Sequence, residues 1–243
     1  MEFQDLEKAT FKAISEFTRD RMCLIDEGTG NLLTSKGRLF IVTCHHVATS
    51  FFKEKRYRYV TLRHNERISK NDLELVAHID GELDVALIET RTAIPKCPAY
   101  EVSHLEVNET FDLADFEKTN VLICGTPGDL TVDKPMGTFY TPFSYMTLPD
   151  ETKFPSSDFL YCQYPVTRDM IDNQSGKRIK LPTAKGFSGA FMLKVKQFKG
   201  SKKQIWSPEI RVIAIQQSWD KKSYIKGTNV KYLMKLMQQC GAA

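Results

Sequence analysis

The stretch Pro182-Thr183-Ala184-Lys185-Gly186-Phe187-Ser188-Gly189-Ala190 decides how the rest of the sequence is interpreted. It contains a Gly-x-Ser-Gly turn, in which glycine permits backbone angles that other residues resist and lets a ligand approach closely. Such a turn exposes the Ser188 hydroxyl as a candidate nucleophile, with the N–H groups of Gly186 and Ser188 positioned to stabilise a negatively charged oxygen. Because Gly-x-Ser-Gly also occurs in ordinary turns, the pattern favours a plain turn until a base and an orienting acid are found.

The composition is that of an ordinary globular protein, with 243 residues of which 42% are hydrophobic and 26% charged. The net charge of +4 is small, so a nucleic-acid partner is not favoured. No stretch is apolar enough to span a bilayer, and the acidic amino terminus lacks a secretory core, so no membrane partner is expected. Six scattered cysteines without a Cys-x-x-Cys pair indicate reduced thiols in the cytoplasm, and no metal or cofactor is expected.

Hydrophobic periodicity divides the chain into a helix, a β-rich body and a second helix. Apolar residues recur at helical spacing over residues 2–20 and again after Asn229. Between them, short runs rich in Leu, Ile, Val and Phe are separated by turn residues, which predicts strands at 22–25, 28–33 and 38–43.

The strand that starts at Arg38 is expected to end in Cys44-His45-His46-Val47-Ala48, so two adjacent histidines, His45 and His46, lie at its end. A metal site would need further ligands nearby, and Cys44 would have its neighbours on the opposite face of an extended strand. One imidazole could be hydrogen-bonded within the sheet, and one could be a general base because imidazole titrates near neutral pH. Since neighbours in a strand face opposite ways, at most one of the two histidines can serve as a base.

A carboxylate in front of an apolar strand is the candidate orienting acid. Asp84 immediately precedes the run Val85–Ile88, so its carboxylate would be partly buried and would need a partner. His46 is an attractive partner, because an acid on the far nitrogen fixes the tautomer and stabilises the imidazolium. Asp84 could also simply cap a turn, and Asp80 is its rival. The candidates run His, Asp, Ser along the chain, an order found in the chymotrypsin class, and Ala190 stands where an α/β-hydrolase turn needs glycine.

Five motifs between residues 28 and 190 occur in an order and spacing that resemble one protein family. They are Gly28-Thr29-Gly30 with Leu32-Leu33, Val42-Thr43-Cys44-His45-His46-Val47, Leu83-Asp84-Val85-Ala86-Leu87-Ile88, Cys124-Gly125-Thr126-Pro127-Gly128 and Gly186-Phe187-Ser188-Gly189. The sequence resembles the trypsin-like serine peptidases of the chymotrypsin fold, and among them the bacterial glutamyl-endopeptidase and HtrA-type branches. The family's base is followed by Val, so the resemblance implies His46 as the base and His45 as a wall residue. It further implies Asp84 as the orienting acid and Ser188 as the nucleophile.

The resemblance implies an all-β fold of two antiparallel six-stranded β-barrels, with an N-terminal and a C-terminal helix. The expected organisation is an N-terminal helical extension at 1–20 and a peptidase domain at 21–243. Within that domain, the first barrel is expected at about 21–95, the second at about 120–228 and the terminal helix at about 229–240. An extended peptide would lie in the cleft between the barrels.

The pocket that would select the substrate is less closely matched. Pro182 stands where trypsin has its pocket Asp, and Thr183 with Gly186 resembles the pocket wall of glutamyl-endopeptidases and viral 3C-like proteases. Those enzymes add a His on the following strand, where this sequence has Gln216 or Gln217. The candidate substrate-binding residues are therefore Pro182, Thr183, Gln216 and Gln217.

The implied function is an intracellular serine endopeptidase that cleaves protein or peptide substrates through an acyl-enzyme, controlled by a protein partner or by loop ordering. A second class is a non-catalytic or conditionally active binding module, whose triad residues would be present but misaligned. A third, ranked last, is a nucleic-acid binder that uses the lysines of the segment 194–203.

Overall fold

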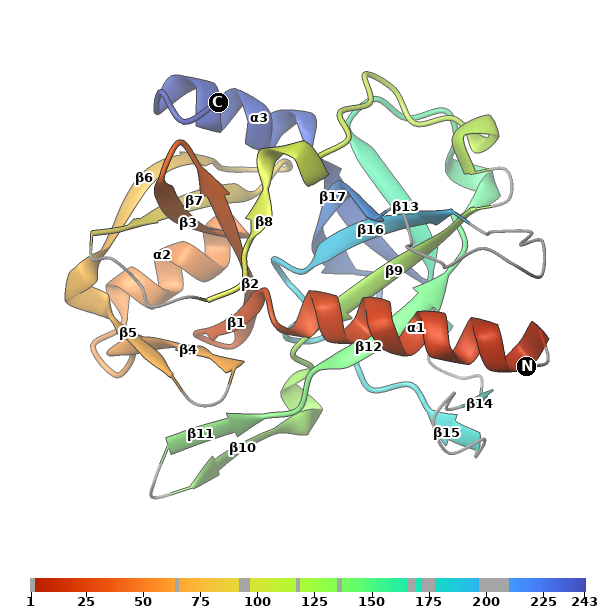
Figure 1. Cartoon of the computed structure of the whole chain (residues 1–243), viewed down its shortest axis with the longest axis horizontal. Coiled ribbons are helices and arrows are strands. Elements are labelled where there is room, and N and C mark those ends of the chain that lie inside the picture. Colours follow the sequence, from red (N-terminus) through yellow and green to blue (C-terminus); the bar gives the residue numbers. More distant parts are fainter. Residues whose placement is uncertain are drawn as a thin grey trace.

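The computed structural model describes residues 3–63, 66–91, 97–116, 119–134, 137–165, 169–171, 178–196 and 210–243. Within these ranges the chain is mostly β, with two large curled antiparallel sheets and three helices (Figure 1). The predicted all-β architecture of two curled sheets is confirmed, with one helix more than the sequence indicated.

The first sheet has the strand order β5-β4-β1-β2-β3-β7-β6, and β8 pairs in parallel with β2. It holds eight strands rather than the six expected, because short segments such as β5 and β8 add to the sheet. Its strands are β1 (Met22–Ile25), β2 (Gly28–Ser35), β3 (Arg38–Thr43), β4 (Tyr59–Leu62), β5 (Arg67–Ser69), β6 (Leu73–Ile79), β7 (Val85–Thr90) and β8 (Tyr100–Glu101).

The second sheet has the strand order β12-β9-β16-β17-β18-β13. A bridge between Pro149, which follows β12, and Cys162 of β13 joins the two ends of this order, so the sheet closes on itself. Its strands are β9 (Thr119–Gly125), β12 (Phe143–Thr147), β13 (Phe159–Gln163), β16 (Phe191–Lys196), β17 (Ile210–Trp219) and β18 (Tyr224–Asn229). Two separate hairpins are formed by β10 (Thr131–Lys134) with β11 (Gly137–Tyr140) and by β14 (Asp169–Ile171) with β15 (Arg178–Lys180).

The helices are α1 (Phe3–Arg19), α2 (His45–Lys53) and α3 (Lys231–Gln239). Helix α1 runs across the second sheet beside β9 and β12, and α3 packs against β6, β7 and β18 (Figure 1). No helix in the described ranges combines the length and the apolar character needed to cross a bilayer.

Helix α2 changes the setting of the two histidines. The sequence placed them at the end of an extended strand, and this prediction was wrong: β3 ends at Thr43 and the helix begins at His45. The rule that neighbouring side chains face opposite ways therefore does not apply to Cys44, His45 and His46. Consecutive residues of a helix differ in direction by only about 100°.

A shared hydrophobic core joins the two sheets. On β3, Phe40 and Val42 point into this shared core together with Leu122 and Phe191 of the second sheet, whereas Ile41 points into the interior of the first. All five residues are fully buried. Since burying a large apolar side chain contributes about 1.5–3 kcal/mol, this contact fixes how the two sheets face each other.

The basic segment at 194–203, proposed above for nucleic acid, lies partly outside the described residues. Within them, Lys194 pairs with Glu106 at 2.9 Å, and its side chain is only 13% exposed. Lys194 is thus engaged inside the protein and does not present a free charge to a phosphate.

Candidate active site

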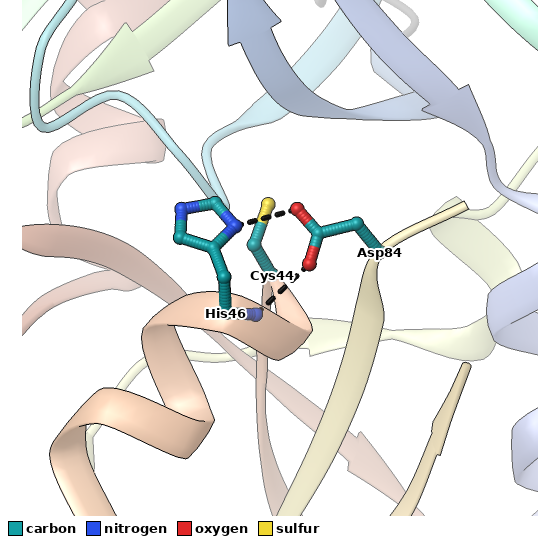
Figure 2. Close-up of side chains that lie close together, drawn as sticks. All are labelled: Cys44, His46 and Asp84. Carbon is teal, nitrogen blue, oxygen red and sulfur yellow. Dashed lines mark hydrogen bonds and ion pairs between the residues drawn. The ribbon is translucent and has the colours of Figure 1, made fainter. Parts of the chain in front are cut away.

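Asp84 holds His46 with both oxygens of its carboxylate (Figure 2). Its Oδ2 lies 2.6 Å from the ring nitrogen Nδ1 of His46, and its Oδ1 accepts a 2.9 Å hydrogen bond from the main-chain N–H of His46. The second contact satisfies one of the unpaired N–H groups at the start of helix α2, where the N-cap residue Cys44 makes no side-chain cap. The carboxylate therefore fixes both the helix start and the imidazole.

The surroundings of the pair leave one ring nitrogen available. Asp84 precedes β7 with a left-handed φ of 48°, a conformation that Asp tolerates better than most residues. Asp84 is 9% exposed, whereas the side chain of His46 is 56% exposed. With Nδ1 donating to the carboxylate, Nε2 lies on the far side of the ring and can accept a proton (Figure 2).

A buried thiol is the third group of this cluster. The Sγ of Cys44, a ring nitrogen of His46 and a carboxylate oxygen of Asp84 lie within 4.8 Å of one another (Figure 2), contrary to the strand-based expectation for Cys44. Burial raises the pKa of the Cys44 thiol well above its ordinary value, and the charge of Asp84 adds to the effect. The thiol donates a 3.2 Å hydrogen bond to the main-chain carbonyl of Gln216. Because metals are bound by thiolates, this environment does not favour a metal site.

His45 is engaged elsewhere. Its ring stacks on that of His78 from β6, with the centroids 4.3 Å apart and the planes 6° from parallel. This contact joins helix α2 to the first sheet. His45 and His46 therefore have different partners, a stacked ring for one and a carboxylate for the other.

The turn that carries Ser188 requires glycine at both ends. Gly186 has φ +93° and Gly189 has φ +96°, in the left-handed region that favours glycine. A methyl group on Gly189 would lie 2.0 Å from the main-chain oxygen of Thr29 and 2.4 Å from the hydroxyl oxygen of Thr43. The backbone of the first barrel therefore approaches this turn more closely than a side chain would allow.

Two buried polar residues of β2 hold the turn in place. The main-chain N–H of Thr29 donates to the carbonyl of Ser188 at 2.9 Å, and its hydroxyl donates to the carbonyl of Gly186 at 2.8 Å. The side-chain amide of Asn31 donates to the carbonyl of Gly189 at 2.7 Å. The two side-chain contacts join residues 157 and 158 positions apart, so no local pattern in the sequence could have identified Thr29 and Asn31 as supports.

The Ser188 hydroxyl donates a 3.2 Å hydrogen bond to the main-chain carbonyl of Gln217. In the part of the chain that the structure describes, it makes no hydrogen bond with His46. Gly28 lies between the two segments: a methyl group there would lie 3.0 Å from the carbonyl oxygen of Ser188 and 2.8 Å from Val47, the residue after His46. The histidine is thus joined directly to its carboxylate, while the turn that carries the serine packs against Gly28.

The main-chain N–H groups of the turn fall into two sets. Those of Phe187, Gly189 and Ala190 donate to the main-chain carbonyls of Ala184, Gln216 and Phe187, at 3.1, 2.8 and 2.7 Å. Those of Gly186 and Ser188 have no acceptor among the described residues. The two N–H groups predicted to form an oxyanion hole are therefore both available to a ligand.

The predicted pocket residues Pro182 and Thr183 are half-buried and held through their main chain. The Tyr164 hydroxyl donates to the carbonyl of Pro182 at 2.9 Å, and the N–H of Thr183 donates to the carboxylate of Asp129 at 2.8 Å. These contacts fix the path of the chain before the serine turn and leave both side chains for other partners. Their role in substrate binding stays a prediction.

Gln216 and Gln217 lie on β17 and are 1% and 9% exposed. The side-chain amide of Gln216 donates to the carbonyl of Ser218 at 3.1 Å, and that of Gln217 donates to the carbonyl of Glu82. Each side-chain amide therefore uses one of its two N–H hydrogens inside the chain. Their side-chain oxygens are buried without a hydrogen-bond partner among the described residues.

Comparison with known proteins identifies the architecture. No family model and no curated protein matches the sequence. A mutant of human heparin-binding protein, a chymotrypsin-fold protein, matches in structure with a TM-score of 0.52, at 12% sequence identity over 93% of this chain and 96% of that chain. The chain has the chymotrypsin fold. A further structure, described in connection with the intrinsically disordered VPg protein of Sesbania mosaic virus, matches with a TM-score of 0.47, at 14% identity over 88% of this chain and 87% of that chain.

In this chymotrypsin fold, the candidate residues come from both barrels. His46 and Asp84 belong to the first barrel, and Ser188 belongs to the second. Together they offer a proton acceptor at Nε2, a hydroxyl on a glycine-flanked turn and two unpaired N–H groups, which are the components of acyl transfer.

Proposed function

We propose that this chain is a serine endopeptidase that cleaves protein or peptide substrates through an acyl-enzyme, with His46, Asp84 and Ser188 as its catalytic residues. The observation that carries the proposal is the double contact of Asp84 with His46. A carboxylate that served only to cap helix α2 would need the main-chain contact alone, whereas the 2.6 Å contact to Nδ1 orients the ring as a base. The unpaired N–H groups of Gly186 and Ser188 give further support.

In the proposed reaction, the Ser188 hydroxyl turns from the Gln217 carbonyl toward Nε2 of His46. Nε2 takes the hydroxyl proton as Oγ bonds to the substrate carbonyl carbon, and the N–H groups of Gly186 and Ser188 hold the resulting oxyanion. The imidazolium, stabilised by Asp84, gives its proton to the leaving amine as the C–N bond breaks. Water then attacks the acyl-enzyme with the same base and releases the acid product.

The proposal includes control of the serine and an intracellular setting. The hydrogen bond from Ser188 to Gln217 occupies the hydroxyl, and we assign the release of this bond to a protein partner or to ordering of a loop by substrate. All six cysteines are free, which favours a reducing compartment. The reaction as written uses no metal and no cofactor.

Labelling with a fluorophosphonate probe tests the proposal, because such probes react with a serine activated by a neighbouring base. We expect the folded wild type to be labelled and both Ser188→Ala and heat-unfolded wild type to remain unlabelled. Equal labelling of wild type and Ser188→Ala would remove Ser188 from the nucleophile role. Peptide mapping of the labelled protein would then show which other residue reacts.

The second candidate is a non-catalytic binding module of the chymotrypsin fold. The observation that favours it is that Ser188 donates to Gln217 and makes no hydrogen bond with His46 among the described residues. A binding module predicts a folded wild type that the probe does not label, with or without substrate peptides. It also predicts that Ser188→Ala retains full affinity for any binding partner.

A further inference from the structure

A lysine–aromatic ladder covers the outer face of strands β13 and β18. The alternate residues Leu160, Cys162 and Ile225 point into the core of the second barrel, so their neighbours on the two strands point outward. The ladder consists of five half-buried residues, which are Lys153, Phe159, Tyr161, Tyr224 and Lys226.

Each lysine of the ladder lies against an aromatic ring. The Nζ of Lys226 is 3.5 Å from the centre of the Phe159 ring, and the Nζ of Lys153 is 4.6 Å from that of Tyr224 and 5.1 Å from that of Tyr161. The Tyr161 and Tyr224 rings meet edge to face, with centroids 5.6 Å apart. These cation–π contacts hold both ammonium groups against the aromatic rings.

The two lysines have no carboxylate within ion-pair distance in the part of the chain that the structure describes. Neither Lys153 nor Lys226 forms an ion pair within the described residues. The negative charge of Glu82, an exposed residue, favours the protonated forms of Tyr161 and Lys226 and so acts to raise the pKa of each. Three further acids near the ladder in the chain already accept hydrogen bonds from the protein's own N–H or O–H groups, and these are Asp150, Asp158 and Asp220.

A hydrogen bond links the strands of the ladder to the loop before Asp84. Thr228 stands opposite Phe159 in the β13–β18 pair, and its hydroxyl donates a 2.6 Å hydrogen bond to the carbonyl of Leu83. Leu83 is the residue before Asp84. Through the buried Thr228, strand β18 is therefore tied to the loop that leads into Asp84.

The geometry also distinguishes between two kinds of anion. Nucleic-acid bases bind aromatic side chains by stacking on a free ring face. Here the Nζ of Lys226 covers a face of Phe159, and Lys153 lies over both tyrosines, so these ring faces are occupied. Carboxylates need only the ammonium groups, and both lysines are half-buried residues rather than fully buried ones. The ladder therefore suits acidic side chains better than bases.

We propose that the ladder binds an acidic segment of a polypeptide, through carboxylates paired with Lys153 and Lys226. That this polypeptide is also the substrate cleaved at Ser188 rests on the proposed function. The binding itself does not, because the ladder lies outside the residues that would carry out the reaction.

Fluorescence anisotropy with labelled hexaglutamate and hexaglutamine tests the binding in the Ser188→Ala protein, where no cleavage interferes. We expect hexaglutamate to bind about tenfold or more tightly than hexaglutamine at low ionic strength, and added salt to remove the difference. The double change Lys153→Glu with Lys226→Glu should abolish this preference. The matched control is Lys12→Glu with Lys55→Glu, which alters the net charge equally at two exposed lysines outside the ladder and should leave the preference intact.

Three results would overturn the proposal. They are equal affinity for the two peptides, an unchanged preference after charge reversal at Lys153 and Lys226, and tighter binding of a short oligothymidylate than of hexaglutamate. Circular dichroism and the unfolding midpoint of each variant separate loss of binding from loss of fold. If hexaglutamate binds as expected but fluorophosphonate does not label the wild type, the ladder stands as a binding surface and the peptidase proposal fails.

Discussion

The side-chain amide of Gln217 donates a hydrogen bond to the main-chain carbonyl of Glu82, across the boundary between the two barrels. The main-chain carbonyl of the same Gln217 accepts the hydroxyl of Ser188. One residue thus contacts both the serine and the loop that leads into Asp84. The sequence suggested Gln217 as a substrate ligand, but its amide donor is used to connect the two halves of the candidate site.

Gln217→Met keeps the size of the side chain and removes this donor. We expect kcat to fall about tenfold or more with little change in KM, because small displacements of reacting groups reduce the rate. Steady-state kinetics on a peptide that the wild type cleaves provides both constants. The control is Gln216→Met, which removes a hydrogen bond to Ser218 within the same strand and should leave kcat nearly unchanged. A rise in KM alone for Gln217→Met would contradict this prediction and would indicate that Gln217 binds the substrate.

The two neighbouring histidines should respond very differently to truncation. His46→Ala removes the ring held by Asp84, and we expect kcat/KM to fall by about 10⁴-fold or more. His45→Ala removes the stack on His78 and should cost about 1 kcal/mol of stability while leaving the rate close to that of the wild type. Kinetics and chemical denaturation of both variants measure these effects. A comparable loss of rate in His45→Ala would contradict the choice of base.

Gly189→Ala should strongly destabilise the protein. The alanine methyl would meet the backbone of Thr29 at 2.0 Å in addition to the strain of a φ of +96°. We expect the free energy of unfolding to fall by about 3 kcal/mol or more, as for other substitutions that force backbone apart. Gly37→Ala is the matched control, because its φ of +76° carries the same kind of strain with nothing within 4 Å. Its expected cost is about 1–2 kcal/mol, and urea denaturation that gave equal values for both would show that the close approach is unimportant.

Asp220, in the turn between β17 and β18, should make stability depend on acid pH. Burial alone would raise its pKa, but hydrogen bonds from the N–H groups of the next residues and a nearby hydroxyl outweigh burial and lower the pKa to about 2. The donors are Lys222, Ser223 and Tyr224. Because the folded pKa lies below the unfolded pKa of about 3.9, the stabilisation is complete above that pH and is lost as the pH falls toward 2.

The variant Asp220→Asn keeps an acceptor for the same N–H groups and cannot titrate. We expect the unfolding free energy of the wild type to fall more steeply than that of Asp220→Asn between pH 4 and pH 2, roughly the interval between the two pKa values. Above about pH 5, the unfolding free energies of the two proteins should change with pH in parallel. Parallel curves over the whole range would show that the carboxylate titrates as it does in the unfolded chain.

The strands and the order of the motifs could be predicted from the sequence, because they depend on local properties. A run of Leu, Phe, Ile and Val bounded by turn residues indicated strand β3, which the structure has at Arg38–Thr43. The apolar run after Asp84 likewise marked β7, and the need for left-handed backbone marked Gly186 and Gly189 as turn residues. The expected contact between Asp84 and His46 is present because each residue lies at the end of such an element.

Tertiary structure alone decided which polar groups meet. Helix α2, which sets the direction of His46, has no strong local signal, and it starts where a carboxylate 38 residues later in the chain caps it. The same holds for Thr29 and Asn31, which hold a turn more than 150 residues away, and for Gln217, whose amide reaches Glu82. Apolar periodicity and the positions of glycine can be recognised within a short stretch of sequence. The first indicates which face of an element is buried, and the second indicates which backbone angles are allowed. A buried hydrogen-bonding group takes whichever partner the packed fold brings to it, and that choice is made only when distant segments come together.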